Sequence, residues 1–302
     1  MRVVRSFARE SPCLFVCSTP IGNLNDVSYR LIETLRSADV IAAEDTRQTR
    51  KLLTHFAVQA ERLVSYHHHN RHKRHTDFVR WWEEGLRIAV VSDAGTPGVS
   101  DPGADAVQLA IATGVPVIPV PGPSAVLSAL VASGLPIQPF TFVGFLPRSR
   151  KEAEVQLEAY RRVPGVLVFY ESPHRVLSTL RWFTEWFPTR QVVLGKELTK
   201  LHETFFYADT AEAMLAELAD EHLRGEFVLI LGPHTEAETI SDDGEQTMTD
   251  AVRMVLSLME AGTSHRAAVQ HVTQVLGVRR KDLYQRTLTG TDPEPNEAGM
   301  DP

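Results

Sequence analysis

The apolar and polar residues follow two alternating patterns between residue 14 and about residue 232. Short runs rich in Val, Ile, Leu and Phe are separated by segments with apolar residues three or four positions apart, which is typical of amphipathic helices. Several runs are continuously apolar, as in strands that are buried on both faces. The alternation predicts an α/β fold. Strands are expected at Leu14–Ser18, Val40–Ala43, Leu63–Tyr66, Arg87–Ser92, Val115–Val120, Thr141–Gly144, Val166–Tyr170, Gln191–Gly195, Thr204–Tyr207 and Phe227–Leu231.

Helices are expected between these strands, each with one apolar stripe facing a sheet. One stripe consists of Leu31, Ile32 and Leu35, and a second of Ala104, Val107, Ala110 and Ile111.

Three turns rich in Gly, Pro, Asn and Asp directly follow predicted strands. They are "STPIGNLND" at 18–26, "SDAGTPGVSDPG" at 92–103 and "PVPGPSAV" at 119–126. These residues are common in any turn. Because ligands of open α/β sheets bind beyond the carboxyl ends of the strands, three such turns also predict one shared ligand site.

The turn at 92–103 is unsuited to phosphate. It lacks the Lys of a P-loop and the G-x-G-x-x-G spacing of a dinucleotide site. Asp93 and Asp101 would repel an anion. The pattern favours a cationic or hydroxyl-rich ligand that approaches the backbone at the glycines.

The chain divides into several segments. A chemical break at residues 134–136 separates two α/β lobes, and an acidic stretch precedes a small helical unit that reads as helix, turn, helix. In that unit Ala251, Val255, Leu258 and Met259 form an apolar face, Ser264 begins a second helix, Gly277 ends it, and a third covers Arg280–Leu288. The expected segments are an N-terminal extension (1–13), an N-terminal lobe (14–134), a C-terminal lobe (135–233), an acidic linker (234–248), a helical RNA-binding unit (249–290) and a disordered tail (291–302).

Charge is unevenly distributed. The formal net charge is −7, but 234–247 carries five Asp or Glu and no Lys or Arg, whereas 248–290 carries six Lys or Arg against three Asp or Glu. Overall acidity therefore does not exclude an anionic partner. For the helical unit, contact with nucleic acid and plain packing or dimerisation both stay open.

Other classes of protein fit the sequence poorly. No apolar stretch reaches the ~20 residues of a bilayer span, and Glu10 interrupts the basic start before a signal-peptide core forms. Cys13 and Cys17 predict neither a disulfide nor a metal site, and no H-E-x-x-H occurs. We expect a cytoplasmic protein without a membrane span.

Eight motifs occur in an order that resembles one known family: "TPIGNL", "AAEDTRQTRKLL", "SYHHHN", "SDAGTPGVSDPG", "PGPSAVLSAL", "FVGFLP", "FYESPHR" and "KELTKLHE". They are similar to the ribosomal RNA small subunit methyltransferase I family, which 2'-O-methylates a cytidine in the decoding region of 16S ribosomal RNA with S-adenosylmethionine. The resemblance spans about 14–289. It implies the tetrapyrrole methylase fold, two α/β lobes with the methyl donor between them, and homodimers are common in that fold.

The resemblance also implies the residues that hold S-adenosylmethionine. The donor is a sulfonium cation. Carboxylates and backbone groups bind such a cation better than a phosphate-binding loop does. Whether Asp93 contacts the donor or only shapes its turn stays open. The expected residues are Pro20, Gly22, Asn23, Asp93, Ala94, Gly95, Thr96, Pro97, Gly122, Ser124, Ala125, Tyr170, Glu171, Gly225 and Glu226.

Transfer to a ribose hydroxyl requires precise positioning and a base that removes the hydroxyl proton. Glu171, Lys196 and Glu197 are the candidates, because each follows an apolar strand and is expected to face the cleft. A structural ion pair is an equally good interpretation of Lys196 and Glu197. Asp101 is a further option, or it only caps the helix after Gly103.

The stretch "SYHHHNRHKRH" is the candidate RNA-contacting segment, because histidine and arginine side chains stack on bases and contact phosphates. Alternatively, this stretch is only the solvent-exposed start of a helix and does not contact RNA. Three consecutive histidines cannot easily ligate one metal ion, because consecutive side chains diverge. The family usually has "SYHEHN" here, so His68 replaces an acid. The expected RNA contacts are Arg47, Arg50, Lys51, His67, His69, Asn70 and Arg148.

The sequence thus predicts a methyltransferase that acts on 16S ribosomal RNA or on the small ribosomal subunit, with a homodimer expected. Two alternatives stay open: a methyltransferase of a tetrapyrrole such as a precorrin, and a non-catalytic RNA-binding protein of ribosome assembly. The basic loops argue against the first, and the intact "SDAGTP" and "PGPSA" turns against the second.

Overall fold

The computed structural model describes residues 12–161, 163, 165–218, 223–233, 248–259, 262–276 and 278–288. The chain forms two compact units, residues 1–233 and residues 234–302. The expected extension before residue 12, the acidic linker up to residue 247, Gly277 and the tail lie outside the described residues. All ten strands expected from the sequence are present.

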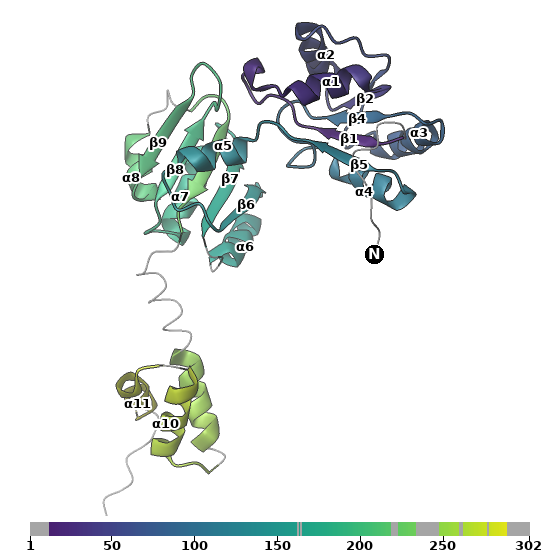
Figure 1. Cartoon of the computed structure of the whole chain (residues 1–302). Coiled ribbons are helices and arrows are strands. Elements are labelled where there is room, and N and C mark those ends of the chain that lie inside the picture. The colour runs from purple at the N-terminus through teal and green to yellow at the C-terminus, as the bar shows by residue number, and fades with distance from the viewer. Residues whose placement is uncertain are drawn as a thin grey trace, which may run out of the picture. The chain divides into compact units, whose positions relative to one another are not determined.

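The first sheet is entirely parallel, with the order β3-β2-β4-β1-β5. Strands β2, β4, β1 and β5 are labelled in Figure 1. Parallel strands covered on both faces need continuous apolar runs, and β2 and β4 are buried at every position. The strands are β1 (Leu14–Cys17), β2 (Val40–Ala43), β3 (Leu63–Ser65), β4 (Ile88–Val91) and β5 (Val117–Val120).

Helices cover both faces of this sheet (Figure 1). A short 3-10 helix (Leu24–Asp26), α1 (Tyr29–Ser37) and α2 (Thr46–His55) follow β1 and β2, and α1 and α2 pack on one face. The other face carries α3 (Arg71–Glu83) and α4 (Ala104–Thr113), with Phe78, Trp81 and Trp82 at the centre of the contact.

The stripe expected on α4 is partly correct, because Val107 and Ala110 pack against the core but Ala104 and Ile111 do not. Ala106 and Ala110 are fully buried, whereas Ala104 and Ile111 are exposed. The helix, "ADAVQLAIAT", is apolar around most of its circumference. Periodicity therefore does not determine which side of it faces the sheet.

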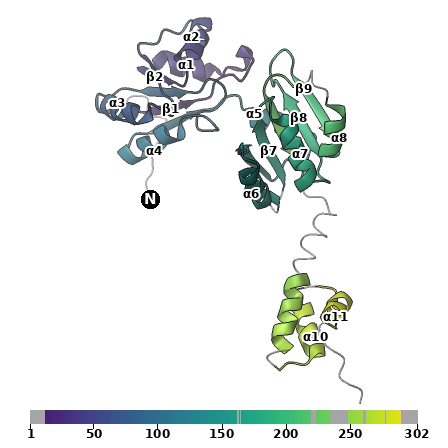
Figure 2. The same cartoon turned by 180° about the vertical axis from the view of Figure 1, so that it is seen from behind.

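The second sheet is mixed, with the order β6-β7-β10-β8-β9. Only β6 and β7 are parallel, and the other pairs are antiparallel. One face carries α6 (Arg150–Arg161), α7 (Val176–Trp186) and α8 (Ala211–Glu217) (Figure 2). The strands are β6 (Phe140–Phe145), β7 (Val166–Glu171), β8 (Val192–Lys196), β9 (Thr204–Ala208) and β10 (Phe227–Leu231).

Helix α5 (Ala125–Ala132) follows β5 of the first sheet but packs on the second. Val126, Ala129 and Leu130 are buried against its strands, including Val228 and Ile230 of β10. By packing, the chain thus enters the second lobe just before residue 125, ahead of the division expected at residue 134. The Gly-Leu-Pro sequence at residues 134–136 follows α5. Such turn residues indicate where a helix ends, but they do not indicate the sheet on which the helix packs.

The C-terminal unit contains a helix over 248–259, α10 (His265–Leu276) and α11 (Arg280–Leu288). Ala251, Val255, Ala268, Val269, Val272 and Leu283 form its core. The expected face is confirmed, since Leu258 and Met259 pack against this core. His265 Nε2 and Thr287 Oγ1 lie 2.8 Å apart, which joins the start of α10 to the end of α11.

Within the described residues, no helix is long and apolar enough to cross a membrane.

Candidate active site

The turns that follow β1, β4 and β5 are in direct contact. Thr19 and Gly95 exchange backbone hydrogen bonds of 2.8 and 3.1 Å. The Ser18 and Thr96 hydroxyls lie 2.8 Å apart. A Cβ on Gly122 would lie 3.0 Å from the Ser18 carbonyl oxygen, so glycine permits the third turn to approach. The expected meeting of three turns is confirmed.

A cavity of about 380 Å³, which we call the donor pocket, opens beside these turns. The second lobe supplies its other wall through the ends of β6, β7 and β10. None of its lining residues among those described is Lys or Arg. Of the residues expected to hold the methyl donor, it is lined by Ala94, Gly95, Thr96, Ser124, Ala125, Tyr170, Glu171, Gly225 and Glu226.

The other expected donor residues do not line this pocket: Pro20, Gly22, Asn23, Asp93, Pro97 and Gly122. The Asn23 side chain accepts a 3.0 Å hydrogen bond from the Asn25 amide, and Gly22 lies so close to Lys200 that a Cβ would overlap its side chain.

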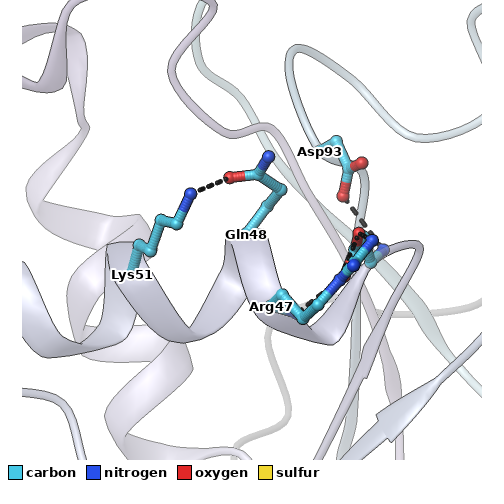
Figure 3. Close-up of polar contacts among 5 residues, drawn as sticks. Arg47, Gln48, Lys51 and Asp93 are labelled. Carbon is cyan, nitrogen blue, oxygen red and sulfur yellow. Dashed lines mark hydrogen bonds and ion pairs between the residues drawn. The ribbon is translucent and has the colours of Figure 1, made fainter.

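Asp93 holds two strand ends together (Figure 3). Its Oδ1 accepts a 3.0 Å hydrogen bond from the Asp45 amide, where α2 begins. Its own amide donates to Glu44 Oε2 at 3.3 Å. Burial raises the pKa of the Asp93 carboxyl. In this structure Asp93 shapes the turn and is absent from the donor-pocket lining.

Asp101 is the carboxylate left free in the donor pocket. It makes no hydrogen bond or ion pair with any described residue, and no cap bond to α4. Burial, reinforced by the Glu44 and Asp93 carboxylates, raises the pKa of Asp101 to about 7. A half-buried acid without a partner is stabilised as an anion by a bound cation. The pocket thus fits the positively charged donor that the motifs imply.

Apolar residues outside the expected set complete the pocket wall. Phe145 ends β6, and its ring centroid lies 5.6 Å from that of Tyr170. Aromatic faces attract cations. Burial and the Asp101 charge raise the pKa of Tyr170 to about 12, so its phenol stays neutral. Phe145 is part of the "FVGFLP" motif, so the sequence pattern could have identified it as a pocket residue. Ile21, Val99, Leu198, Phe227 and Val228 also line the pocket.

Glu171 lines the donor pocket, but both its oxygens are occupied. Oε1 accepts a 2.9 Å bond from the Ser172 amide, and Oε2 accepts a 2.7 Å bond from the Thr179 hydroxyl. Arg175 Nε lies 3.5 Å from Oε1, and the Glu171 side chain is 1% exposed. These contacts anchor the end of β7 to α7.

Thr179→Val is expected to lower the free energy of unfolding by about 2 kcal/mol, because a buried carboxylate loses a hydrogen-bond donor. Urea denaturation monitored by circular dichroism measures the change. Thr184→Val, on the same helix, is the control, since Thr184 only donates to a helix carbonyl. Equal effects of the two substitutions would contradict an anchoring role for Glu171.

Glu197 and Lys196 do not line the donor pocket. Glu197 Oε1 accepts bonds from Lys200 Nζ at 2.8 Å and from the Glu226 amide at 2.9 Å. Burial opposes ionisation, but these two donors outweigh it and lower the pKa of Glu197. The carboxylate thereby holds the turn at residues 225–226, where Gly225 has φ +95°.

The expected basic contacts lie at several places. Arg47 is 82% exposed and pairs with Asp45 at 2.6 Å, while Lys51 donates to Gln48 at 3.1 Å (Figure 3). Arg50 is exposed on the same helix, and Arg148 is exposed after β6. Helix α2 follows β2, and the three histidines His67–His69 follow the neighbouring strand β3. Because these strands are parallel, both segments begin at the same carboxyl-end side of the sheet.

A second cavity, of about 530 Å³, contains the three histidines, and we call it the histidine pocket. Asn70 does not line it. Its amide instead donates to Ser65 and accepts from the His67 amide, which holds the segment against β3. No group of three or more potential metal ligands occurs among the described residues. The lining is Glu44, Tyr66, His67, His68, His69, Arg71 and Ser100 to Asp105.

Comparison with known proteins gives consistent matches. Residues 14–214 match the family model for tetrapyrrole (corrin/porphyrin) methylases. Proteins named ribosomal RNA small subunit methyltransferase I are 42% identical over 271 residues in Halalkalibacterium halodurans and 39% identical over 272 residues in Bacillus subtilis. The alignments cover 90% of this chain and 93% and 92% of those proteins.

Solved structures share the fold at low identity. A diphthine synthase is 15% identical with a TM-score of 0.59, covering 74% of this chain and 91% of that one. A uroporphyrin-III C-methyltransferase from Thermus thermophilus, complexed with S-adenosyl homocysteine, is 19% identical with a TM-score of 0.52, covering 73% and 97%.

Proposed function

The chain belongs to the ribosomal RNA small subunit methyltransferase I family, within the tetrapyrrole methylases, and from this we propose that its target is the 2'-hydroxyl of a cytidine ribose in the decoding region of 16S ribosomal RNA. It is an S-adenosylmethionine-dependent ribosomal RNA methyltransferase. We further propose that it acts in the cytoplasm as a homodimer, as the family resemblance implies.

One observation supports this function most directly. The donor pocket and the histidine pocket share Ser100 and Asp101 in their linings. A methyl donor in the first and a nucleotide in the second would therefore meet at these two residues. The histidine and arginine side chains of the second pocket suit an RNA strand.

The chain's own residues perform the positioning. Bound S-adenosylmethionine supplies an electrophilic methyl group on a sulfonium. Asp101 offers the countercharge, and the Phe145 and Tyr170 rings offer faces to a cation. Of the side chains considered as base, Glu171 and Asp101 line this pocket. The contacts of Glu171 support an anchoring role, whereas Asp101 has no hydrogen-bond partner among the described residues.

The test uses small ribosomal subunits from cells that lack this protein. Purified protein and labelled S-adenosylmethionine are expected to place one methyl group on a decoding-region cytidine, located by mass mapping. A ribose 2'-O-methyl group also blocks alkaline cleavage of the adjacent phosphodiester. A methyl group on the base, or label appearing only in precorrin supplied as a rival substrate, would refute the proposal. Donor binding without any transfer would favour the assembly-protein alternative.

We also propose that the C-terminal unit binds RNA, because Arg279, Arg280 and Lys281 are exposed where α11 begins. The double variant Arg279→Gln, Arg280→Gln is expected to bind RNA about tenfold more weakly. The slope of log affinity against log salt should fall by roughly 1 to 2 for two lost phosphate contacts. Fluorescence anisotropy at several salt concentrations measures both, with Arg181→Gln on α7 as control. An unchanged slope would exclude phosphate contacts at these residues.

A further inference from the structure

The histidine pocket is built from the carboxyl ends of two neighbouring strands and the turn before α4. Glu44 follows β2, the three histidines follow β3, and Ser100 to Asp105 complete the wall. Its volume of about 530 Å³ lies in the range of small-molecule sites and is sufficient for a nucleoside. The pocket joins the donor pocket at Ser100 and Asp101.

Two polar groups in this pocket have unused hydrogen-bonding capacity. Glu44 Oε2 accepts the Asp93 amide at 3.3 Å, whereas its Oε1 has no partner among the described residues. Burial, only partly offset by that amide, raises the pKa of Glu44. The Nδ1 atom of His67 is buried and also lacks a partner among the described residues. Buried polar groups without hydrogen-bond partners destabilise the folded protein. A ligand that supplies the missing partners is therefore bound tightly.

The other charged groups of the pocket are already engaged or shared. Arg71 pairs with Asp105 at 2.6 Å. Asp101 also lines the donor pocket. The Tyr66 hydroxyl lies 3.1 Å from His75 Nε2. Glu44 is therefore the acidic group that lines this pocket but not the donor pocket, makes no ion pair with a described residue, and has an oxygen available to a second ligand.

We propose that the histidine pocket receives the base of the target nucleotide and that Glu44 reads the exocyclic amine of cytosine. This inference rests on the proposed function. Cytosine presents an N4 amine donor, which a carboxylate accepts, beside acceptors at N3 and O2. In the tautomer that carries its hydrogen on Nδ1, His67 donates from this atom to one of these acceptors. Uracil presents O4 in place of the amine, and O4 faces the carboxylate without a proton between them.

The exposed rings of His68 and His69 lie at the same pocket and offer stacking surfaces to an unstacked base. Stacking does not distinguish cytosine from uracil, since both have similar faces. Discrimination between the two bases is therefore assigned to Glu44, and base placement to the histidines.

Glu44→Gln tests this assignment, because Gln retains an oxygen for the Asp93 amide and turns an N–H toward the base. The substrates are small subunits reconstituted with cytidine or uridine at the target position. The native protein is expected to prefer cytidine by about 10- to 100-fold in kcat/KM. In the variant this ratio should fall at least tenfold, partly through faster methylation of uridine. Glu83→Gln, an exposed carboxylate on α3, should leave the ratio unchanged.

His67→Ala provides a second test that does not depend on Glu44. It should lower kcat/KM for the cytidine substrate about tenfold while S-adenosylmethionine affinity, measured by calorimetry, stays within twofold. A native cytidine preference in Glu44→Gln, or loss of donor binding in either variant, would overturn the inference. If the native protein methylates neither substrate, the proposed function itself fails, and that result is distinct from an unchanged preference.

Discussion

Asp101→Asn is expected to weaken the binding of S-adenosylmethionine by about 100-fold. Asp101 is half-buried in the donor pocket, and its carboxylate has no partner among the described residues. A hydrogen bond or ion pair to a charged group contributes about 1.5–3 kcal/mol when both groups are desolvated. Asn keeps the shape of the side chain but removes the countercharge for the cationic donor. Isothermal titration calorimetry measures the loss.

The same carboxyl predicts a pH dependence with a definite sign. The pKa of Asp101 is raised to about 7 in the ligand-free protein, so below that pH the side chain is mostly neutral. A cation binds the ionised form, so donor affinity should fall by roughly tenfold per unit as the pH decreases below the pKa. No histidine lines the donor pocket among the described residues, so the variant should show a nearly flat profile.

Two controls make this result specific. Asp101→Glu restores the charge on a longer side chain and should recover part of the affinity and the pH dependence. Asp209→Asn, an exposed carboxylate outside the donor pocket, should bind the donor as the native protein does. Unchanged affinity in Asp101→Asn would show that the donor does not use this carboxylate.

Gly103→Ala is expected to lower the free energy of unfolding by about 3 kcal/mol and to reduce kcat/KM about 100-fold. Gly103 has φ +157°, and a Cβ there would lie 2.8 Å from the Gly98 amide nitrogen and 2.9 Å from Pro97. Backbone strain and overpacking each cost about 1–3 kcal/mol. Relief of the clash must move the turn that contains Ser100 and Asp101, and a 1 Å misplacement can cost roughly 100-fold in rate.

Gly85→Ala is the matched control for this substitution. Gly85 has φ +85°, but nothing lies within 4 Å of its Cβ position. Its cost should be about 1 kcal/mol, from backbone conformation alone, with native activity. Denaturant unfolding and steady-state kinetics compare the two variants. Equal losses in both would mean that the close contact around Gly103 does not hold the active-site turn.

The sequence predicted the strands well and the packing of helices less well. Continuous runs such as Phe227–Leu231 are typical of strands buried on both faces, and the structure has this strand with the expected bounds. Two members of the stripe expected on α4 were wrong because apolar residues lie around most of this helix. The sheet on which α5 packs was missed because its amphipathicity carries no information about which of two sheets lies nearby.

The candidate site shows the same division. Motif order indicated that three turns share one site, and those turns are in contact. Within the turn at 92–103, however, Asp93 and Asp101 look alike in sequence. The Asp93 carboxylate accepts a hydrogen bond from the Asp45 amide. Asp101 has no such partner among the described residues and lines the donor pocket.

The sequence by itself determined the α/β class, the strands and the identity of the turns, because apolar period and turn chemistry are local properties of the chain. Only the tertiary structure decided which acids are engaged and which are free. Glu171 meets Thr179 and Ser172, Glu197 meets Lys200 and Glu226, and Asp101 meets no described partner. Hydrogen-bond satisfaction depends on atoms that other elements bring within about 3 Å, and residue spacing does not encode that distance.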